Sequence, residues 1–464
     1  MKYMEIKIRG MIMWSKKVFI IIIVFVILIL FVWLYVCPIS PVCSNPPCTI
    51  DSNKRIKFFI ATDPHYLSKD LTDRGKAYRN FIMAGDGKQL NYIEEIMDAF
   101  IYDIKNQKPN VLIISGDLTN NGERESHLDF SEKLKIIQDS GTSVYVIPGN
   151  HDIKNPWAVE FKGKKKHKVK TISDKDFAKI YGDFGYNDAI SRDENSLSYL
   201  AAPSKDLWLL MMDTNQYENN MTFNRPQHDG LICPGTLQWI KECSDLAKEK
   251  NAQVIAVMHH SLLDHSQVVN EGYTLNNNKD AIEIFKNCGI ELVLTGHIHL
   301  QSIKSYKEKN ISIYDVATSA LCVYPHKYGI IEYCPKRGYD YSTAWIDMEG
   351  WASKNNINDK NINNFKEYSK KFFENRSYYK FYDDLYDIHE YTDKDMRLMS
   401  EILAKLNLKY FEGSGNINVK EVRKSPGYKL VKSIGPDFLK EYMESILDNQ
   451  NIDNNKLHIP IKNN

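Results

Sequence analysis

Aspartate, asparagine and histidine residues recur in five short stretches of the sequence between residues 63 and 299. Most of these stretches directly follow an apolar run rich in β-branched residues, where a strand is expected to end and a loop to begin. Carboxylate and imidazole groups without thiolates suit Mn, Fe, Zn or Co. The pattern therefore predicts a metal centre on the loops that follow the strands. The five stretches are Asp63-Pro64-His65, Gly116-Asp117, Gly149-Asn150-His151-Asp152, His259-His260 and Gly296-His297-Ile298-His299.

Two of these stretches place potential ligands two positions apart, namely Asp63 with His65 and His297 with His299. In an extended chain, residues i and i+2 point the same way, so each pair can address one ion. Asp117 follows the end of a buried strand, where its two carboxylate oxygens can each take a different metal. Glycine precedes several of these residues and permits the sharp exit from strand to loop that aims the next side chain into the site.

Taken together and in this order, the motifs resemble the signature of the calcineurin-like metallophosphoesterases, over about residues 54–348. The resemblance implies a dinuclear centre bridged by Asp117. At the histidine pair it favours His259, which directly follows the strand, and His260 is the alternative. Ser261 replaces a proline that is common after this pair, and Asn120 stands where relatives often carry aspartate. The implied ligands are Asp63, His65, Asp117 and His299 for one metal, and Asp117, Asn150, His259 and His297 for the other.

The same resemblance implies the reaction, which is hydrolysis of a phosphate ester. Two ions of Mn, Fe or Zn about 3.5 to 4 Å apart lower the pKa of a bridging water, and the hydroxide attacks phosphorus in line. His151 is expected to donate a proton to the leaving oxygen, and Asp152 to orient the ring of His151. We therefore predict His151 and Asp152 as catalytic residues.

Runs of strand length alternate with helix-patterned segments over residues 54–348, which predicts an α/β catalytic domain. The resemblance implies a four-layer α/β/β/α sandwich for this domain. Two further runs, Tyr328 to Tyr333 and Thr343 to Asp347, are predicted as edge strands. The other predicted strands are Ile56–Ala61, Val111–Ser115, Ser143–Ile147, Ser196–Ala201, Leu207–Met212, Val254–Met258, Leu292–Leu294 and Ile311–Val316.

The sequence beyond Gly350 becomes rich in Lys, Asn and Tyr and keeps a helical periodicity. We predict a smaller all-helical domain over residues 350–450, followed by a tail over residues 451–464. Thr392 is the predicted cap of one of its helices. The stripe of Tyr379, Tyr382 and Tyr386 is interpreted as core or domain interface, with a ligand platform as the alternative. A second predicted stripe consists of Met396, Met399, Leu403 and Leu406.

Residues 18–36 contain no charged residue, glycine or proline, and at ~1.5 Å per residue they can cross a ~30 Å hydrocarbon core. They are predicted to form a transmembrane anchor. Lysine and arginine occur in residues 1–17 and then not until Lys54, so the positive-inside rule places the N-terminus in the cytosol and the catalytic domain outside the cytoplasm. The Pro- and Cys-rich residues 37–53 are predicted to be a tether. A cleaved signal peptide and lipidation at Cys37 are the alternatives.

The formal net charge is +1, because 60 basic residues are matched by 59 acidic ones. This balance argues against a nucleic-acid polymer as partner. A lysine-rich tract between Lys162 and Lys170 is interpreted as a solvated loop, with a role at the mouth of the site as the alternative. Three histidines outside the motifs, His127, His265 and His326, are interpreted as ordinary core or surface residues.

The predicted function is metal-dependent hydrolysis of a phosphodiester in a small molecule. The order of domains, with the wording of Gly116 to Glu123, is similar to bacterial class III cyclic-nucleotide phosphodiesterases. An outward-facing enzyme has little obvious access to cytosolic cyclic nucleotides, so phospholipid and wall-polymer diesters stay open as substrates. A phosphomonoesterase is the enzymatic alternative, and a non-catalytic surface scaffold is the other. Neither the substrate nor the oligomeric state follows from the sequence.

Overall fold

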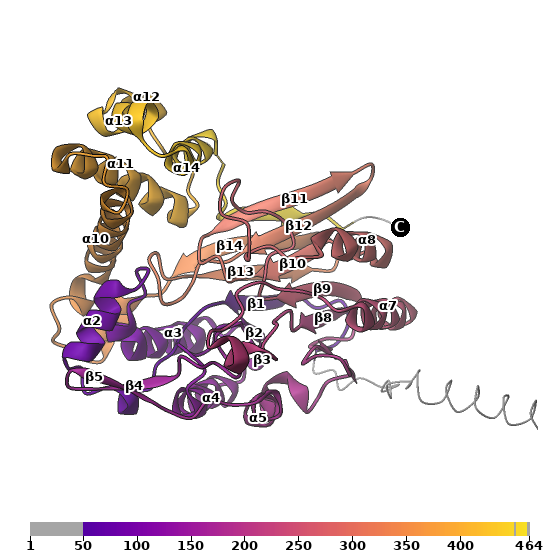
Figure 1. Ribbon diagram of the computed structural model, residues 1–464. Coiled ribbons are helices and arrows are strands. Elements are labelled where there is room, and N and C mark those ends of the chain that lie inside the picture. Colours follow the sequence, from indigo (N-terminus) through magenta and orange to yellow (C-terminus); the bar gives the residue numbers. More distant parts are fainter. Residues whose placement is uncertain (1–49, 450–451, 462–464) are drawn as a thin grey trace, which may run out of the picture. The chain divides into compact units, whose positions relative to one another are not determined.

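Two β-sheets lie at the centre of the computed structural model, which describes residues 50–449 and 452–461 (Figure 1). In the first sheet β1, β2 and β3 run parallel, while β13, β14 and β15 continue on the other side of β1, each antiparallel to its neighbour. Its order is β15 (Lys456–Ile459), β14 (Gly338–Trp345), β13 (Lys327–Cys334), β1 (Ile56–Ala61), β2 (Val111–Ser115) and β3 (Ser143–Ile147).

In the second sheet β8, β9, β10 and β12 are parallel. β11 is antiparallel to β12, β7 is antiparallel to β8, and β6 is antiparallel to β7. A separate hairpin of β4 (Val159–Lys162) and β5 (Lys165–Lys168) holds most of the lysine-rich tract. The order of the second sheet is β11 (Ser302–Glu308), β12 (Ile311–Ala317), β10 (Leu292–Thr295), β9 (Gln253–Met258), β8 (Leu207–Met212), β7 (Tyr199–Ala201) and β6 (Ser191–Arg192).

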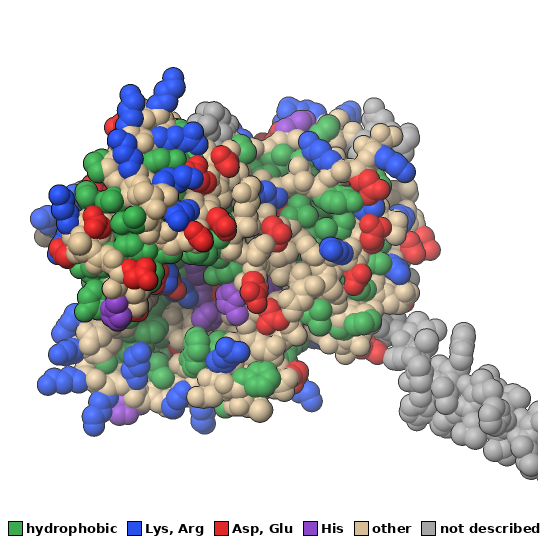
Figure 2. Space-filling view, turned by 45° about the horizontal axis from the view of Figure 1, so that its top comes forward, with side chains coloured by type: hydrophobic (Ala, Val, Ile, Leu, Met, Phe, Trp, Pro, Cys, Tyr) green, Lys and Arg blue, Asp and Glu red, His purple; other side chains and the backbone are tan. Residues whose placement is uncertain are grey.

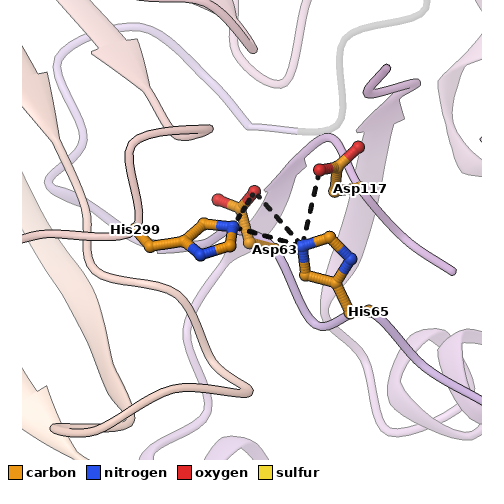
Figure 3. A group of neighbouring side chains, drawn as sticks. All are labelled: Asp63, His65, Asp117 and His299. Atoms are coloured by element: carbon orange, nitrogen blue, oxygen red, sulfur yellow. Dashed lines mark hydrogen bonds and ion pairs between the residues drawn. The ribbon is translucent and has the colours of Figure 1, made fainter. Parts of the chain in front are cut away.

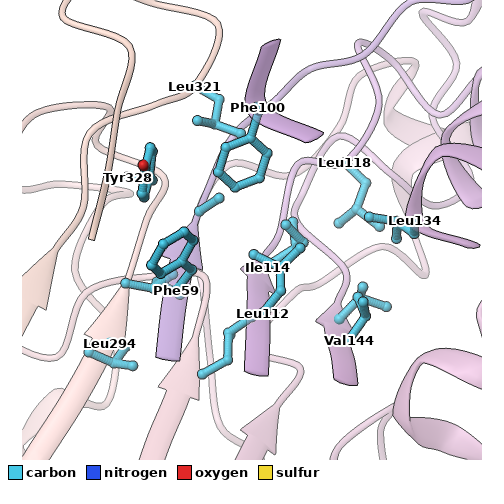
Figure 4. Packing of buried hydrophobic residues seen from close by; sticks show 14 of the residues in the cluster. Phe59, Phe100, Leu112, Ile114, Leu118, Leu134, Val144, Leu294, Leu321 and Tyr328 are labelled. Atoms are coloured by element: carbon cyan, nitrogen blue, oxygen red, sulfur yellow. The ribbon is translucent and has the colours of Figure 1, made fainter. Parts of the chain in front are cut away.

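The sheets pack face to face, with helices on their outer faces. Alternation along β8 shows this, because Leu207, Leu209 and Met211 join the large cluster shared with the first sheet. Their neighbours Trp208, Leu210 and Met212 join the cluster formed with the outer helices α7 (Pro234–Glu249) and α8 (Asn278–Cys288). On the first sheet, the Tyr328 ring packs against Phe59 and against Phe100 of α3 (Ile93–Gln107), with ring centroids 4.8 and 5.2 Å apart (Figure 4). The expected α/β fold is therefore confirmed.

The helices of the catalytic region connect these strands. The longer ones are amphipathic: Ile93, Ile96, Phe100 and Ile104 bury one face of α3. Its helices are α2 (Lys76–Ala84), α3 (Ile93–Gln107), α4 (Arg124–Gln138), α5 (Asp174–Ile180), α6 (Asn220–Phe223), α7 (Pro234–Glu249), α8 (Asn278–Cys288) and α9 (Met348–Lys354).

The expected C-terminal helices are also present, with a buried cluster of their own. Thr392 caps α11, as predicted, by accepting a hydrogen bond from the Asp395 backbone N–H at 3.2 Å. The predicted Met396, Met399, Leu403 and Leu406 stripe is buried. These helices are α10 (Phe365–Tyr386), α11 (Asp393–Glu412), α12 (Val419–Lys424), α13 (Pro426–Ile434) and α14 (Asp437–Asp448).

Two predictions about packing were wrong. The runs expected as edge strands, β13 and β14, lie inside the first sheet. β13 pairs with β1 on one side and β14 on the other, and β15 from near the end of the chain pairs with the outer side of β14. The tyrosine stripe is not core: Tyr379 and Tyr386 are 50% and 57% exposed. The face of α10 that packs inward repeats every four residues and consists of Phe365, Ser369, Phe373, Ser377, Phe381 and Leu385.

No helix in the described ranges, 50–449 and 452–461, combines the length and the apolar composition needed to cross a membrane. The predicted transmembrane anchor at residues 18–36 and its tether up to residue 49 lie outside those ranges.

His326 ties the C-terminal helices to the catalytic region. Its Nδ1 donates to the backbone carbonyl of Leu321 and its Nε2 accepts from the Ser369 hydroxyl of α10, both at 2.7 Å. A ring held in this way is neutral, and burial lowers the pKa of His326 to about 4. His326 is therefore a core histidine, as predicted.

We expect this buried ring to make the protein less stable in acid. Its folded-state pKa lies below the value of about 6.5 in an unfolded chain, so its contribution is complete above that value and is lost as pH falls toward 4. Between pH 7 and pH 5 the linkage removes about 2 kcal/mol of unfolding free energy. Urea titrations should show that His326→Gln, although less stable at pH 7, loses less stability over this interval. Equal losses in both proteins would exclude His326 as the titrating group.

Candidate metal centre

Four of the predicted ligands meet at the ends of β1, β2 and β10 (Figure 3). These are Asp63, His65, Asp117 and His299, whose potential ligand atoms all lie within 4.8 Å of one another. The Nε2 atom of His65 is 3.4 Å from Asp117 Oδ2, 3.9 Å from Asp63 Oδ1 and 3.2 Å from His299 Nε2. The Nε2 atom of His299 is 3.3 Å from Asp63 Oδ1. Their ligand atoms thus converge on one point.

A second group shares Asp117 and adds His259 and His297, again with ligand atoms within 4.8 Å. The His259 Nε2 atom is 3.5 Å from Asp117 Oδ2 and 3.2 Å from Asn150 Oδ1. His259 Nδ1 donates to the backbone carbonyl of Ser115 at 2.9 Å, and this bond turns Nε2 toward Asp117. His297 Nε2 donates to the Gly272 carbonyl at 3.1 Å, which leaves Nδ1 as its ligand atom.

His260, the alternative at this position, has both ring nitrogens engaged elsewhere. Nε2 donates to the backbone carbonyl of His228 at 3.0 Å, and Nδ1 accepts from the Thr214 hydroxyl at 2.8 Å. The geometry favours His259.

Asp117 differs from its expected arrangement. Its two oxygens were expected to face different metals, but Oδ2 alone lies near both His65 and His259, at 3.4 and 3.5 Å. Its other oxygen, Oδ1, accepts the backbone N–H of His151 at 2.8 Å. One oxygen is thus placed to be shared between two ions, while the other orders the adjacent loop.

The backbone at the centre is also different from the extended form that we expected for the ligand pairs. Left-handed conformations, which cost on the order of 1–3 kcal/mol for residues with a side chain, cluster at functional sites. Here they explain how side chains two positions apart turn toward one centre. The residues concerned are Asp63, His65, Asp117, His297 and His299, with φ of 50°, 43°, 49°, 67° and 63°.

Glycine is required at position 149 for a different reason. A Cβ atom there would lie 2.1 Å from the Asp117 backbone nitrogen and 2.2 Å from Asp117 Oδ1. Any larger residue would push Asp117 out of place. The loops that carry Asp117 and Gly149 can approach this closely only because glycine has no side chain.

The donor set fits metal ions. Asp63 Oδ1 is buried and has no hydrogen-bond partner among the described residues, which is costly for a carboxylate oxygen unless a cation satisfies it. Burial raises the pKa of Asp117, but the His259, His151 and His65 rings outweigh it and hold that pKa well below its usual range. Burial lowers the pKa of His259, yet the Asp117 carboxylate raises it to about 9. A metal ion replaces such a proton on a ligand histidine.

His151 lines the same cavity, but its ring is oriented differently from our prediction. Its Nδ1 atom donates to the Asn120 carbonyl at 2.8 Å and is 3.1 Å from Asn121 Oδ1. Asp152, which we predicted to orient the ring of His151, does not do so. Its carboxylate accepts four hydrogen bonds, from the backbone of Leu118, Thr119 and Gly149 and from the Thr119 hydroxyl, at 2.8 to 3.0 Å. Asp152 therefore joins the loops after β2 and β3.

Sequence reasoning missed several residues around the centre. Thr62 Oγ1 donates to Asp63 Oδ2 at 2.5 Å, and Lys88 Nζ lies 3.3 Å from His65 Nδ1. The rings of His228 and His297 are 4.4 Å apart between centroids. These residues carry no motif, and only their position relative to the ligands distinguishes them. The lysine-rich tract, by contrast, lies on an exposed hairpin, and His127 and His265 are buried core residues.

A cavity of about 590 Å³ opens over the metal centre and reaches the C-terminal helices. Figure 2 shows histidine side chains at the bottom of this hollow. The catalytic region contributes Asp117, His151, His297 and His299 to its lining. The wall formed by α10, α11 and α14 contributes Phe373, Arg376, Lys380, Phe381, Phe411, Phe438 and Tyr442.

Comparison with known families agrees with this site. The family model for calcineurin-like phosphoesterase matches residues 56–301, more than half of the chain, and the chain therefore belongs to that family. The expected enzyme class, a metal-dependent phosphoesterase, is confirmed. A second model, described as the C-terminal domain of cyclic nucleotide phosphodiesterase, matches residues 347–453.

Similarity to individual proteins is limited. A probable glycerophosphodiester phosphodiesterase GpdQ of Arcobacter nitrofigilis is 44% identical over 45 residues, which cover 10% of this chain and 15% of that protein. A dimetal phosphatase from Danio rerio is 12% identical, with a TM-score of 0.43, over 62% of this chain and 96% of that one. The purple acid phosphatase PPD1 from yellow lupin (Lupinus luteus) is 12% identical, with a TM-score of 0.42, over 66% and 53%.

The two adjacent histidines provide a matched pair of variants. After loading with Mn²⁺, we expect His259→Gln to lose one metal equivalent per chain and to lower turnover by about 100-fold or more, because a ligand and its charge are removed. His260→Gln should keep both equivalents, since its ring is engaged away from the centre. Metal content per chain, with circular dichroism as the check on folding, measures the difference. The opposite result would reassign the ligand to His260.

Proposed function

We propose that this protein is a phosphodiester hydrolase that acts on 3′,5′-cyclic nucleotides. The observation that carries the proposal is the match of residues 347–453 to the C-terminal domain of cyclic nucleotide phosphodiesterase, together with the place of those residues in the fold. Side chains of α10, α11 and α14 form the wall of the cavity that faces the metal centre. The C-terminal region therefore contacts whatever part of the substrate extends beyond the scissile phosphate.

The chemistry of the cavity supports a substrate of this kind. Its volume of about 590 Å³ exceeds what a phosphate group fills and lies in the range of small-molecule sites. The aromatic side chains of Phe373, Phe381 and Phe438 suit a flat base, on which they can stack. Arg376 and Lys380 of α10 add positive charge, and Arg376 Nε is buried without a hydrogen-bond partner among the described residues.

We assign the predicted ligands as follows. Asp63, His65, Asp117 and His299 would hold one ion, and Asp117, Asn150, His259 and His297 the other. Two ions, when bound, lower the pKa of a water molecule and neutralise charge on the phosphate oxygens. Mn, Fe and Zn all suit this donor set.

Within this scheme His151 holds the proton for the leaving oxygen. Its Nδ1–H is committed to Asn120, so Nε2 is the atom that exchanges a proton with substrate. Burial lowers the pKa of His151 to about 4, so the ring is neutral at neutral pH in the free protein. The negative charge of a bound phosphate raises that pKa and favours a proton on Nε2.

A substrate panel on the Mn²⁺-loaded protein tests the proposal. We expect hydrolysis of 3′,5′-cyclic AMP or cyclic GMP, and bis-p-nitrophenyl phosphate to be turned over at least about 10-fold faster than p-nitrophenyl phosphate. Asp117→Asn should lower all turnover by about 100-fold or more, because the shared oxygen loses its charge. Phosphate release and absorbance at the p-nitrophenolate band are the measurements.

The other outcomes separate the alternatives. Faster hydrolysis of the monoester would identify a phosphomonoesterase. Activity on glycerophosphodiesters or wall-polymer diesters without activity on cyclic nucleotides would move the substrate class. An inert protein with its full metal content would support a scaffold. Asp183→Asn, at an exposed position of the short π-helix Gly182–Tyr186, is the control for loss of a carboxylate.

We also propose that residues 18–36 anchor the protein in the cell membrane, with residues 1–17 in the cytosol and the catalytic region outside. The uncharged run at residues 18–36 and the absence of Lys and Arg between residues 18 and 53 support this topology. Substrates would then be extracellular. Protease treatment of intact cells should release a soluble, active fragment, detected with an antibody against the C-terminal helices. Full protection of the fragment would contradict the topology.

A further inference from the structure

Lys88 lies on the loop between α2 and the short helix Leu90–Tyr92, and it lines the cavity over the metal centre. Its Nζ atom is 3.3 Å from Nδ1 of His65, a predicted ligand. Lys88 is half-buried, whereas Asp86, which precedes Gly87 on the same loop, is exposed. A lysine ammonium directed into a cavity toward a cluster of histidines requires an acceptor, because it carries three donors and no lone pair.

The backbone on both sides of Lys88 is held in place. Gln89 is fully buried and its N–H donates to the carbonyl of Cys322 at 2.8 Å. Gly87 adopts a φ of 87°, and a Cβ atom there would lie 2.8 Å from the Phe373 ring of α10. The loop therefore packs against a C-terminal helix, and the backbone that carries Lys88 is fixed on both sides.

With a metal ion on Nε2, His65 would not accept a hydrogen bond from Lys88. His65 directs Nε2 toward Asp63, Asp117 and His299, so Nε2 is its ligand atom. A neutral histidine that binds a metal through Nε2 carries its proton on Nδ1, which then donates. The Nδ1–H group of His65 and the ammonium of Lys88 would then both be donors, so the ammonium needs another acceptor.

The protein offers few acceptors within the cavity. The carboxylates of Asp86 and Asp384 line it, but both residues are exposed, and Lys88 forms no ion pair with a carboxylate among the described residues. Asp117 Oδ1 already accepts the His151 N–H, and Oδ2 faces the ligand histidines. The other acceptors in the lining, such as the amides of Asn120 and Asn121, are neutral, so an oxygen of an anion bound over the metal centre is the charged acceptor that remains.

We propose that Lys88 binds a non-bridging phosphate oxygen of the substrate, and of the phosphate product, over the metal centre. The assignment rests on the proposed phosphoester hydrolysis and adds a substrate-binding residue to it. Lys88 comes from a loop without a motif and is positioned by α10. The C-terminal helices thus contribute to binding of the scissile phosphate as well as of the organic group.

Titration calorimetry of inorganic phosphate onto the full-length, Mn²⁺-loaded protein tests this role. We expect Lys88→Met to raise the phosphate Kd by about 10- to 100-fold, the range that a charge-assisted hydrogen bond supplies. Lys88→Arg, which keeps the charge, should recover part of the affinity. Metal content per chain should be unchanged in both variants. Lys164→Met, in the exposed turn of the β4–β5 hairpin, is the matched control and should bind phosphate like the unmodified protein.

Two results would overturn the assignment. Lys88→Met could keep its metal and bind phosphate with unchanged affinity, which would exclude a contact. It could instead lose metal, with phosphate affinity falling in proportion, which would make Lys88 a support for His65. Neither result depends on the identity of the ester: a protein that binds phosphate through Lys88 but hydrolyses no diester would refute the proposed function and leave this assignment standing.

Discussion

A single buried oxygen, Oδ2 of Asp117, lies between the Nε2 atoms of His65 and His259, at 3.4 and 3.5 Å. The rest of the site is arranged so that this carboxylate can be anionic in the interior. Three histidines hold the pKa of Asp117 low against the effect of burial, and its second oxygen accepts a backbone N–H. Gly149 leaves room for it, since a Cβ atom there would overlap Asp117. A buried charge without such partners would be strongly destabilising.

The loops around this carboxylate are held by hydrogen bonds that do not involve a metal. Asp152 accepts N–H groups from the loops after β2 and β3, and the backbone N–H of His65 donates to the Asp117 carbonyl at 2.9 Å. Such bonds oppose the strain of the left-handed ligand residues. Hydrogen bonds within the protein therefore hold these loops in place, and such preorganisation favours electrostatic stabilisation of a transition state.

The C-terminal helices form a buried cluster of their own and also line the cavity over the metal centre. Residues of α10 contribute to the core of the first sheet at Phe365 and Phe373, to the His326 contact through Ser369, and to the cavity wall. Phe373 also packs on the loop that carries Lys88. One helix thus links the catalytic sheets to the wall of the cavity, and a change in its position would alter both that wall and the loop that carries Lys88.

Local patterns in the sequence were enough to predict which residues cluster at the strand ends and much of the sheet. Strands β1, β2, β3 and β8 begin and end at the predicted residues, because a buried parallel strand is a continuous apolar run bounded by turn residues. The ligand motifs were recognisable because coordination requires particular side chains at short spacings on the loops that follow. The same local signals predicted the Thr392 cap and the buried methionine and leucine stripe of α11.

Features that depend on partners distant in the chain could not be predicted from local sequence patterns. The Asn120 carbonyl orients His151, and a backbone carbonyl has no signature in a sequence. The place of β14 inside the sheet depends on β15, more than a hundred residues away, and that of β13 depends on its pairing with the distant β1. The inward face of α10 alternates Phe365, Ser369 and Phe373, so its apolar pattern is weaker than that of the exposed tyrosines. Lys88 could not be predicted as a site residue, because its nearness to His65 depends on the packing of its loop against α10. No local pattern in the sequence encodes that packing.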